Sequence, residues 1–241
     1  MRDERSLDEK LAPQDFVGDF IWAARAVFSQ PSVALLSIAL WCIPVAISFL
    51  TDSRTALACL ACWFVTFGWY GAERVFFLCK RDGKEVSLGD LLWCAPHFGG
   101  RFFRLGLLAA AVALPLRALV FARLGQTPSK AARVELLLIV VAGDFLLTFV
   151  TSALVFTTRS AWQALRIGVG MIRQTWPRSG LYVLCPPLAL NMFNAIYPTH
   201  LPVVRVVSTA TFVLLALLAK GATVAFYLRE RPIVPDVVGT I

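Results

Sequence analysis

Four polar residues of this sequence lie in or beside long apolar runs, where charged side chains are rare. They are Glu73, Asp144, Thr148 and Lys220, and Thr148 follows Asp144 by one helical turn. Acids and amines inside a membrane face protein or water, where they transfer protons, bind ions or contact lipid headgroups. We therefore predict an intramembrane polar cluster of these four residues in a cavity open to the cytoplasm. The alternative is that they form structural pairs between helices.

The depth of each charge separates these two interpretations. Glu73 and Lys220 are close enough to a predicted span end to reach it or to pair, so their pattern favours a structural role. Asp144 is near the middle of its apolar run and cannot reach either surface, so both interpretations stay open for it. Arg74, next to Glu73, is expected to point elsewhere and to extend toward the cytoplasm.

The elements that must position these residues are membrane-spanning helices. The chain has 241 residues, of which 58% are hydrophobic and only 16% charged, with a mean hydropathy of +0.71. The apolar residues are concentrated in blocks of about the 20 residues that cross a bilayer as helix. We predict an all-α polytopic membrane protein with six transmembrane helices: Ser32–Leu50, Thr55–Ala72, Leu105–Ala122, Leu136–Phe156, Ser179–His200 and Val206–Leu228.

The distribution of Lys and Arg predicts the orientation of these spans. The termini and the second and fourth loops hold fifteen of them, against five on the opposite side. Because basic loops stay inside, we predict a multi-pass protein of the bacterial cytoplasmic (inner) membrane, with residues 1–14 and 229–241 as cytoplasmic tails. The net charge of +8 then suits anionic lipids, and no nucleic-acid partner is expected.

Amphipathic segments precede the first, third and fifth spans. In the clearest one, Trp162, Val169 and Trp176 recur at helical spacing, and arginines mark another face. This pattern is typical of a helix lying in the headgroup plane. We predict three such cytoplasmic interfacial helices, whose lipid or partner surface comprises Arg101, Arg104, Arg159, Arg166 and Arg173. A Ser87-Leu-Gly-Asp90 sequence predicts a capped helix start in the second.

An offset of 71 residues links several features of the chain. It relates Asp19-x-x-Trp22 to Asp90-x-x-Trp93, Glu73 to Asp144, and three evenly spaced prolines to one another. Fixed-period similarity indicates a repeated structural unit. A single integral membrane domain, 1–241, is therefore predicted to contain three copies of one interfacial helix plus two spans, at 15–80, 87–157 and 160–228.

Motifs for catalysis are not found in the sequence. It has no phosphate-binding loop, no nucleophile elbow and no zinc-protease motif, and its two histidines are predicted on opposite sides of the membrane. We expect no enzyme activity, no cofactor and no metal site.

Two segments resemble a known group of proteins. They are the stretch from Gly68 to Trp93, with a basic turn and "GKEVSLGDL", and the later "AWQALRIGVGMIRQTW". They resemble bacterial six-helix inner-membrane proteins of poorly known function, such as the membrane domain attached to some glycerophosphodiester phosphodiesterases. The phosphodiesterase catalytic domain has no counterpart here. The resemblance implies a stand-alone membrane module that assists lipid, envelope or transport work.

These features favour two kinds of function. The first is a non-enzymatic membrane scaffold or accessory subunit that acts through anionic lipids, a membrane protein partner or a homo-oligomer, using its basic interfacial helices. The second is a small transporter or permease subunit that uses Glu73, Asp144 and Lys220.

Overall fold

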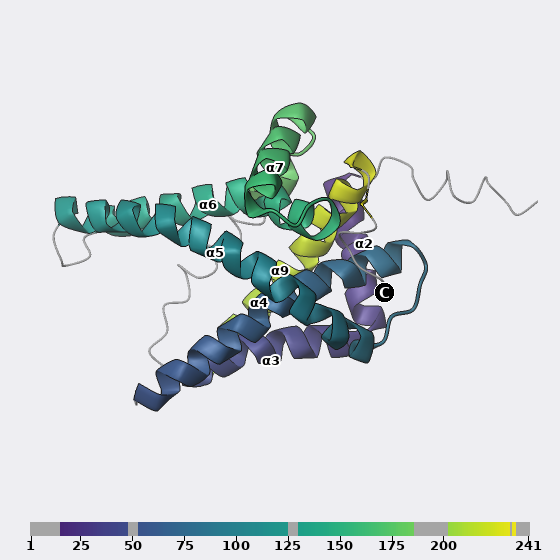
Figure 1. Cartoon of the computed structure of the whole chain (residues 1–241), viewed down its shortest axis with the longest axis horizontal. Coiled ribbons are helices and arrows are strands. Elements are labelled where there is room, and N and C mark those ends of the chain that lie inside the picture. Colours follow the sequence, from purple (N-terminus) through teal and green to yellow (C-terminus); the bar gives the residue numbers. More distant parts are fainter. Residues whose placement is uncertain (1–14, 48–52, 125–129, 186–201, 232, 235–241) are drawn as a thin grey trace, which may run out of the picture.

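A computed structural model describes residues 15–47, 53–124, 130–185, 202–231 and 233–234 of the chain, and these residues form helices and turns without a strand. The prediction of an all-α protein is therefore confirmed for the described part (Figure 1). The helices are α2 (Phe16–Ser29), α3 (Pro31–Ile47), α4 (Ser53–Arg81), α5 (Leu88–Leu124), α6 (Lys130–Phe156), α7 (Ala161–Thr175) and α9 (Pro202–Glu230).

Two of the described helices are long and apolar enough to cross a membrane. They are Leu88–Leu116 within α5 and Val207–Glu230 within α9, with mean hydropathies of 1.3 and 1.8. A third candidate is the pair Phe16–Ser29 and Pro31–Cys42, which is bent by 92°. The first predicted span ends outside the described residues, and the fifth lies largely outside them. The total of six spans therefore stays a prediction.

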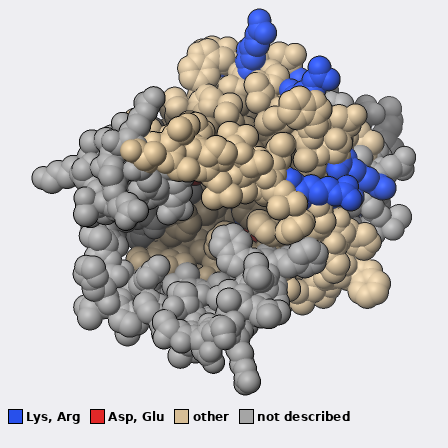
Figure 2. Space-filling model, turned by 60° about the vertical axis from the view of Figure 1, so that its left-hand side comes forward, with Lys and Arg blue, Asp and Glu red and all other residues tan. Residues whose placement is uncertain are grey.

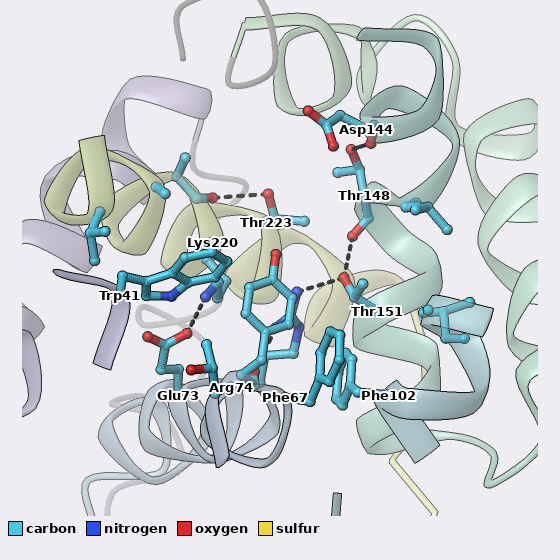
Figure 3. A pocket seen from close by; sticks show the side chains of 18 of the residues that line it. Trp41, Phe67, Glu73, Arg74, Phe102, Asp144, Thr148, Thr151, Lys220 and Thr223 are labelled. Atoms are coloured by element: carbon cyan, nitrogen blue, oxygen red, sulfur yellow. Dashed lines mark hydrogen bonds and ion pairs between the residues drawn. The ribbon is translucent and has the colours of Figure 1, made fainter. Parts of the chain in front are cut away.

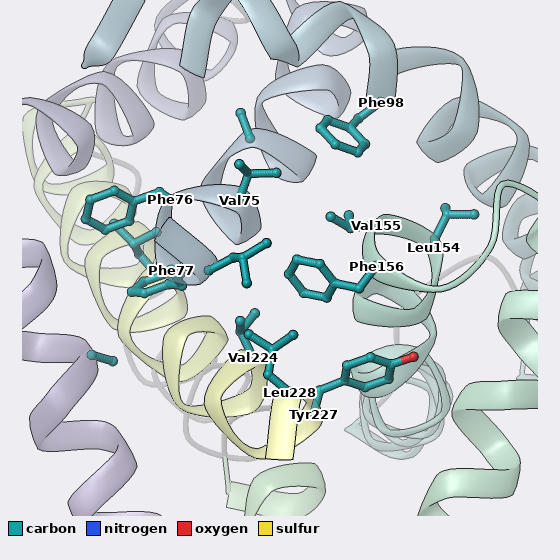
Figure 4. Packing of buried hydrophobic residues seen from close by; sticks show 14 of the residues in the cluster. Val75, Phe76, Phe77, Phe98, Leu154, Val155, Phe156, Val224, Tyr227 and Leu228 are labelled. Atoms are coloured by element: carbon teal, nitrogen blue, oxygen red, sulfur yellow. The ribbon is translucent and has the colours of Figure 1, made fainter. Parts of the chain in front are cut away.

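Helix α9 is at the centre of the molecule. It packs against α2, α3, α4 and α6, and 72% of its apolar window is buried. By contrast, only 17% of the corresponding window of α5 is buried. Figure 1 shows α3 beside α4 and α5 beside α6, as two pairs that diverge from this centre. The buried core formed by α4, α5, α6 and α9 includes the aromatic residues Phe76, Phe77, Phe98, Phe156 and Tyr227 (Figure 4).

Small residues allow the closest helix contacts. A Cβ atom at Gly68 of α4 would lie 2.7 Å from the carbonyl oxygen of Ala95, and one at Gly168 of α7 would lie 2.6 Å from the backbone nitrogen of Val150. Since a backbone atom cannot move aside, both positions require glycine. Small residues commonly allow such close approach between membrane helices.

The ends of three helices meet on one side of the bundle. Arg81, the last residue of α4, donates to the carbonyl of Leu228 in α9 at 3.0 Å. The backbone N–H of Val234 donates to the carbonyl of Phe156, the last residue of α6, at 2.8 Å. Both contacts satisfy carbonyl groups that a helix C-terminus leaves open. They also show that the C-terminal ends of α4, α6 and α9 lie close together.

The second amphipathic segment was predicted to be a separate interfacial helix, and this prediction is wrong. α5 runs without a break from Leu88 to Leu124, through Pro96 and Pro115. Prolines are tolerated inside such helices because neighbouring groups satisfy the freed carbonyls. The predicted cap is confirmed, because Ser87 and Asp90 exchange hydrogen bonds of 3.0 and 3.1 Å. α2 and α7, the first and third amphipathic segments, are separate helices.

The features used to predict the repeat have unlike surroundings. Asp19 is buried at 1% exposure, whereas Asp90 lies on the surface. Trp22 contacts Phe77 with ring centroids 5.9 Å apart, whereas Trp93 is 82% exposed. The three-unit repeat therefore stays a prediction.

The boundary of the C-terminal tail is also revised. α9 continues to Glu230, so residue 229 is part of the helix and the tail begins later; residues 1–14 lie outside the described part.

Candidate functional site: a polar cavity within the helix bundle

A cavity of about 380 Å³ lies among α3, α4, α5, α6 and α9. Small-molecule sites typically have volumes of about 300–1,000 Å³. Figure 2 shows a hollow on one face of the molecule, and the Lys and Arg side chains of the described residues on this face lie away from it. All four residues of the predicted cluster line the cavity: Glu73, Asp144, Thr148 and Lys220.

Glu73 and Lys220 form a buried ion pair on one side of the cavity. The Lys220 ammonium donates to Oε2 of Glu73, and both side chains are almost fully enclosed, with exposures of 8% and 1%. Ser37 of α3 donates to Oε1 of Glu73 at 2.7 Å, and the Trp69 indole donates to Ser37 at 2.8 Å. Lys220 also lies over the Tyr70 ring, 3.7 Å from its centroid. Both ions are therefore compensated by charge and by hydrogen bonds, as buried charges must be.

The expectation that Arg74 extends toward the cytoplasm is wrong, because Arg74 lines the cavity. Its side chain is only 3% exposed and points into the bundle, not toward a surface. It donates to the Tyr70 carbonyl at 2.7 Å and to Oγ1 of Thr151 at 2.5 Å (Figure 3). The guanidinium lies 4.4 Å from the centroid of the Tyr70 ring and 5.6 Å from that of Phe102.

Helix geometry explains how Glu73 and Arg74 share one cavity. Residues 66, 70 and 73 form one stripe of α4 at spacings of four and three, and residues 67, 70 and 74 form the adjacent stripe. All five of these residues line the cavity: Thr66, Phe67, Tyr70, Glu73 and Arg74. The cavity is wide enough to contact both stripes, because its other walls come from α5 and α6 as well as from α9.

Asp144 and Thr148 lie on the opposite wall from Glu73. Asp144 is exposed, and Thr148 donates to its backbone carbonyl at 2.8 Å. Thr151, three residues further along α6, accepts from Arg74. Figure 3 shows Asp144 at the far end of this polar row and the Glu73–Lys220 pair across the cavity.

The charged cavity residues lie roughly two to four helical turns before the C-terminal ends of their helices. Glu73 is eight residues before the end of α4, Lys220 ten before the end of α9, and Asp144 twelve before the end of α6. At 1.5 Å per residue these separations are roughly 12, 15 and 18 Å.

A second buried ionic cluster joins α2 to α9 and to residues 180–185. Arg229 donates two hydrogen bonds of 2.6 and 2.5 Å to the carboxylate of Asp19, and the Tyr182 hydroxyl donates to the same carboxylate at 2.5 Å. Arg229 was expected in a cytoplasmic tail, and Asp19 was considered as part of the predicted repeat. The pair is separated by 210 positions, so periodicity within either helix could not reveal it.

The predicted basic surface is only partly a surface. Arg104, Arg159, Arg166 and Arg173 are exposed. Arg101 is half-buried: it donates to the Leu154 carbonyl at 3.4 Å and lies 5.1 Å from the centroid of the Phe98 ring.

Comparison of this chain with protein-family models, with curated proteins and with solved structures finds no match. The resemblance to six-helix inner-membrane proteins therefore stays a prediction.

Proposed function

We propose that this chain is a six-span protein of the bacterial cytoplasmic membrane that binds a small polar or amphiphilic ligand in its cavity, as a small transporter or permease subunit. The observation that carries this proposal is the cavity itself. Where an ion pair only fixes helix packing, close-packed side chains are expected to leave no cavity beside it. Here the buried pair Glu73–Lys220 borders about 380 Å³ of open space, together with Arg74.

The positions of the charges support the same function. Charged groups inside membrane helices commonly mark ion pathways and substrate sites. The cavity residues come from five helices, so a bound ligand would contact most of the bundle at once. In this proposal both termini are cytoplasmic, and the cavity lies roughly 12–18 Å from the cytoplasmic ends of α4, α6 and α9.

Proton flux into liposomes tests this proposal. Purified protein is reconstituted with a pH-sensitive dye in the lumen, and dye response is followed after a pH step. We expect Asp144→Asn, which removes a charge at the exposed rim, to lower the protein-dependent flux by tenfold or more. The control is Arg178→Gln, because Arg178 is exposed and pairs with Glu230 away from the cavity. Flux equal to wild type in Asp144→Asn would contradict a transport role for the cavity.

A second candidate is a scaffold or accessory subunit that acts through anionic lipid or a protein partner. It is favoured by α7, where Trp162, Val169 and Trp176 are 60%, 40% and 53% exposed beside exposed Arg166 and Arg173. Such a combination is typical of helices that lie on a membrane surface.

A further inference from the structure

Arg74 is a buried cation without an acidic partner among the described residues. An arginine side chain stays protonated in proteins, so its charge must be compensated when it is buried. The groups in direct contact with it are a carbonyl, a hydroxyl and two aromatic rings, all of them uncharged, and Glu73 acts on it only at longer range. The Nε atom is buried and has no hydrogen-bond partner.

The two acids of the cavity do not compensate this charge by direct contact. The carboxylate of Glu73 is bound by Lys220 and Ser37. Asp144 lies seven residues before Thr151 on α6, which is roughly 10 Å along the helix, and its side chain is at the exposed rim. The guanidinium therefore contributes positive charge to the inner part of the cavity.

Much of the remaining cavity wall is apolar or aromatic. Phe102, Leu105 and Ala109 of α5 contribute to it, as do Val213 and Ala216 of α9. A small hydrated anion would leave these groups without a favourable contact. A ligand with an apolar portion would bury them.

We propose that the cavity binds an amphiphile with a single anionic head, a carboxylate or a phosphate monoester. In this arrangement Arg74 holds the head, and the apolar wall holds the tail. Guanidinium groups suit both heads, since their planar N–H donors match carboxylate and phosphate oxygens. This inference rests on the proposed function, because it names the ligand class of the same cavity.

Binding of radiolabelled dodecanoate to the full chain in maltoside micelles tests this proposal. A scintillation proximity assay gives the affinity, and dodecyl phosphate, 1-dodecanol and inorganic phosphate serve as competitors. We expect saturable binding that dodecyl phosphate displaces, whereas 1-dodecanol lacks the charge and inorganic phosphate lacks the tail. Displacement by 1-dodecanol as effective as that by dodecyl phosphate would overturn the role of the charge. Equally effective inorganic phosphate would overturn the role of the tail.

Variants locate the site. We expect Arg74→Gln to weaken binding on the order of tenfold to a hundredfold, since it removes a charge-assisted contact. Arg178→Gln is the matched control and should bind like wild type. Size-exclusion elution and melting temperature report whether each variant folds. If Arg74→Gln fails to fold, Ala216→Phe provides the test, because it fills the cavity and leaves every charge in place. A folded variant of either kind with wild-type affinity would overturn the proposal.

The outcome separates this inference from the proposed function. Proton flux that depends on Asp144, in a protein that binds none of the probes, would overturn the anionic ligand and leave the transport proposal intact. Binding that depends on Arg74, without flux that depends on Asp144, would support the ligand class and contradict transport.

Discussion

At the scale of single residues, the two buried ion pairs have different surroundings. Asp19 and Arg229 are joined by two hydrogen bonds and further enclosed by Tyr182, and none of these three residues lines the cavity. Glu73 and Lys220 are also buried, but they border the cavity. A pair of the first kind fixes the packing of helices, whereas a pair of the second kind can also be reached by a ligand.

Removing one partner of the cavity pair is expected to destabilise the protein more than removing both. Glu73→Gln leaves the Lys220 ammonium buried without a counter-charge, which costs about 3–5 kcal/mol of unfolding free energy. The double variant Glu73→Gln/Lys220→Met should recover most of this loss. Unfolding by titration with a denaturing detergent measures both effects.

A surface pair provides the control for this cycle. Arg81 and Asp82 are 3.4 Å apart and about a third exposed, so Asp82→Asn should change the unfolding free energy by less than about 1 kcal/mol. A Glu73→Gln protein as stable as wild type would show that the buried pair is not coupled as the structure indicates.

At the scale of helices, α7 has a packed face and an exposed face. Ala164, Gly168 and Met171 pack against the bundle, and Gly168 permits contact with the backbone of α6. The large exposed residues Trp162 and Trp176 lie on the opposite side, which Arg166 and Arg173 share. The helix is thus held to the bundle by small residues, while its exposed aromatic and basic side chains remain available to a membrane surface.

Reversing the charges of this helix tests whether it binds anionic lipid. Each arginine near such a surface contributes about 1 kcal/mol of attraction. We expect phosphatidylglycerol to raise the melting temperature of the wild-type protein more than phosphatidylcholine does. The triple variant Arg159→Glu, Arg166→Glu and Arg173→Glu should lose this difference.

The response to phosphatidylcholine is the internal control, because it should be the same in both proteins. A triple variant that still prefers phosphatidylglycerol would contradict the lipid-surface role of α7.

At the scale of the whole molecule, one end of the bundle is tied together and the other diverges. The ends of α4, α6 and α9 meet through backbone and arginine contacts. The pairs α3–α4 and α5–α6 separate beyond the cavity (Figure 1). This shape suits a site that opens toward one side of the bundle while its charged residues stay fixed by the closed end.

The proposed topology predicts which parts of the chain face the cytoplasm. After replacement of the six native cysteines, a single cysteine is introduced as Arg2→Cys, Ile241→Cys or Gln126→Cys. A membrane-impermeant maleimide applied to intact spheroplasts should label only the Gln126→Cys protein, since positions 2 and 241 are predicted to be inside. Labelling after lysis confirms that every site can react. Labelling of Ile241→Cys in intact spheroplasts would contradict the proposed topology.

Local sequence patterns were sufficient to predict the all-helical fold and the three charged cavity residues Glu73, Asp144 and Lys220. Apolar blocks of spanning length leave the backbone little alternative to helix. Glu73, Asp144 and Lys220 stand out because each interrupts such a block, and Ser87 and Asp90 form a cap because both partners lie within one turn. These features depend on neighbours a few positions apart, which a sequence displays directly.

Long-range packing, by contrast, determines which helices meet and where their side chains point. Arg74 points into the bundle because α5 and α6 place Phe102 and Thr151 beside it. Asp19 is buried because Arg229 of a distant helix packs against it. Both results depend on contacts between segments far apart in the chain. Helical periodicity reports which residues share a face, but not which other helix covers that face.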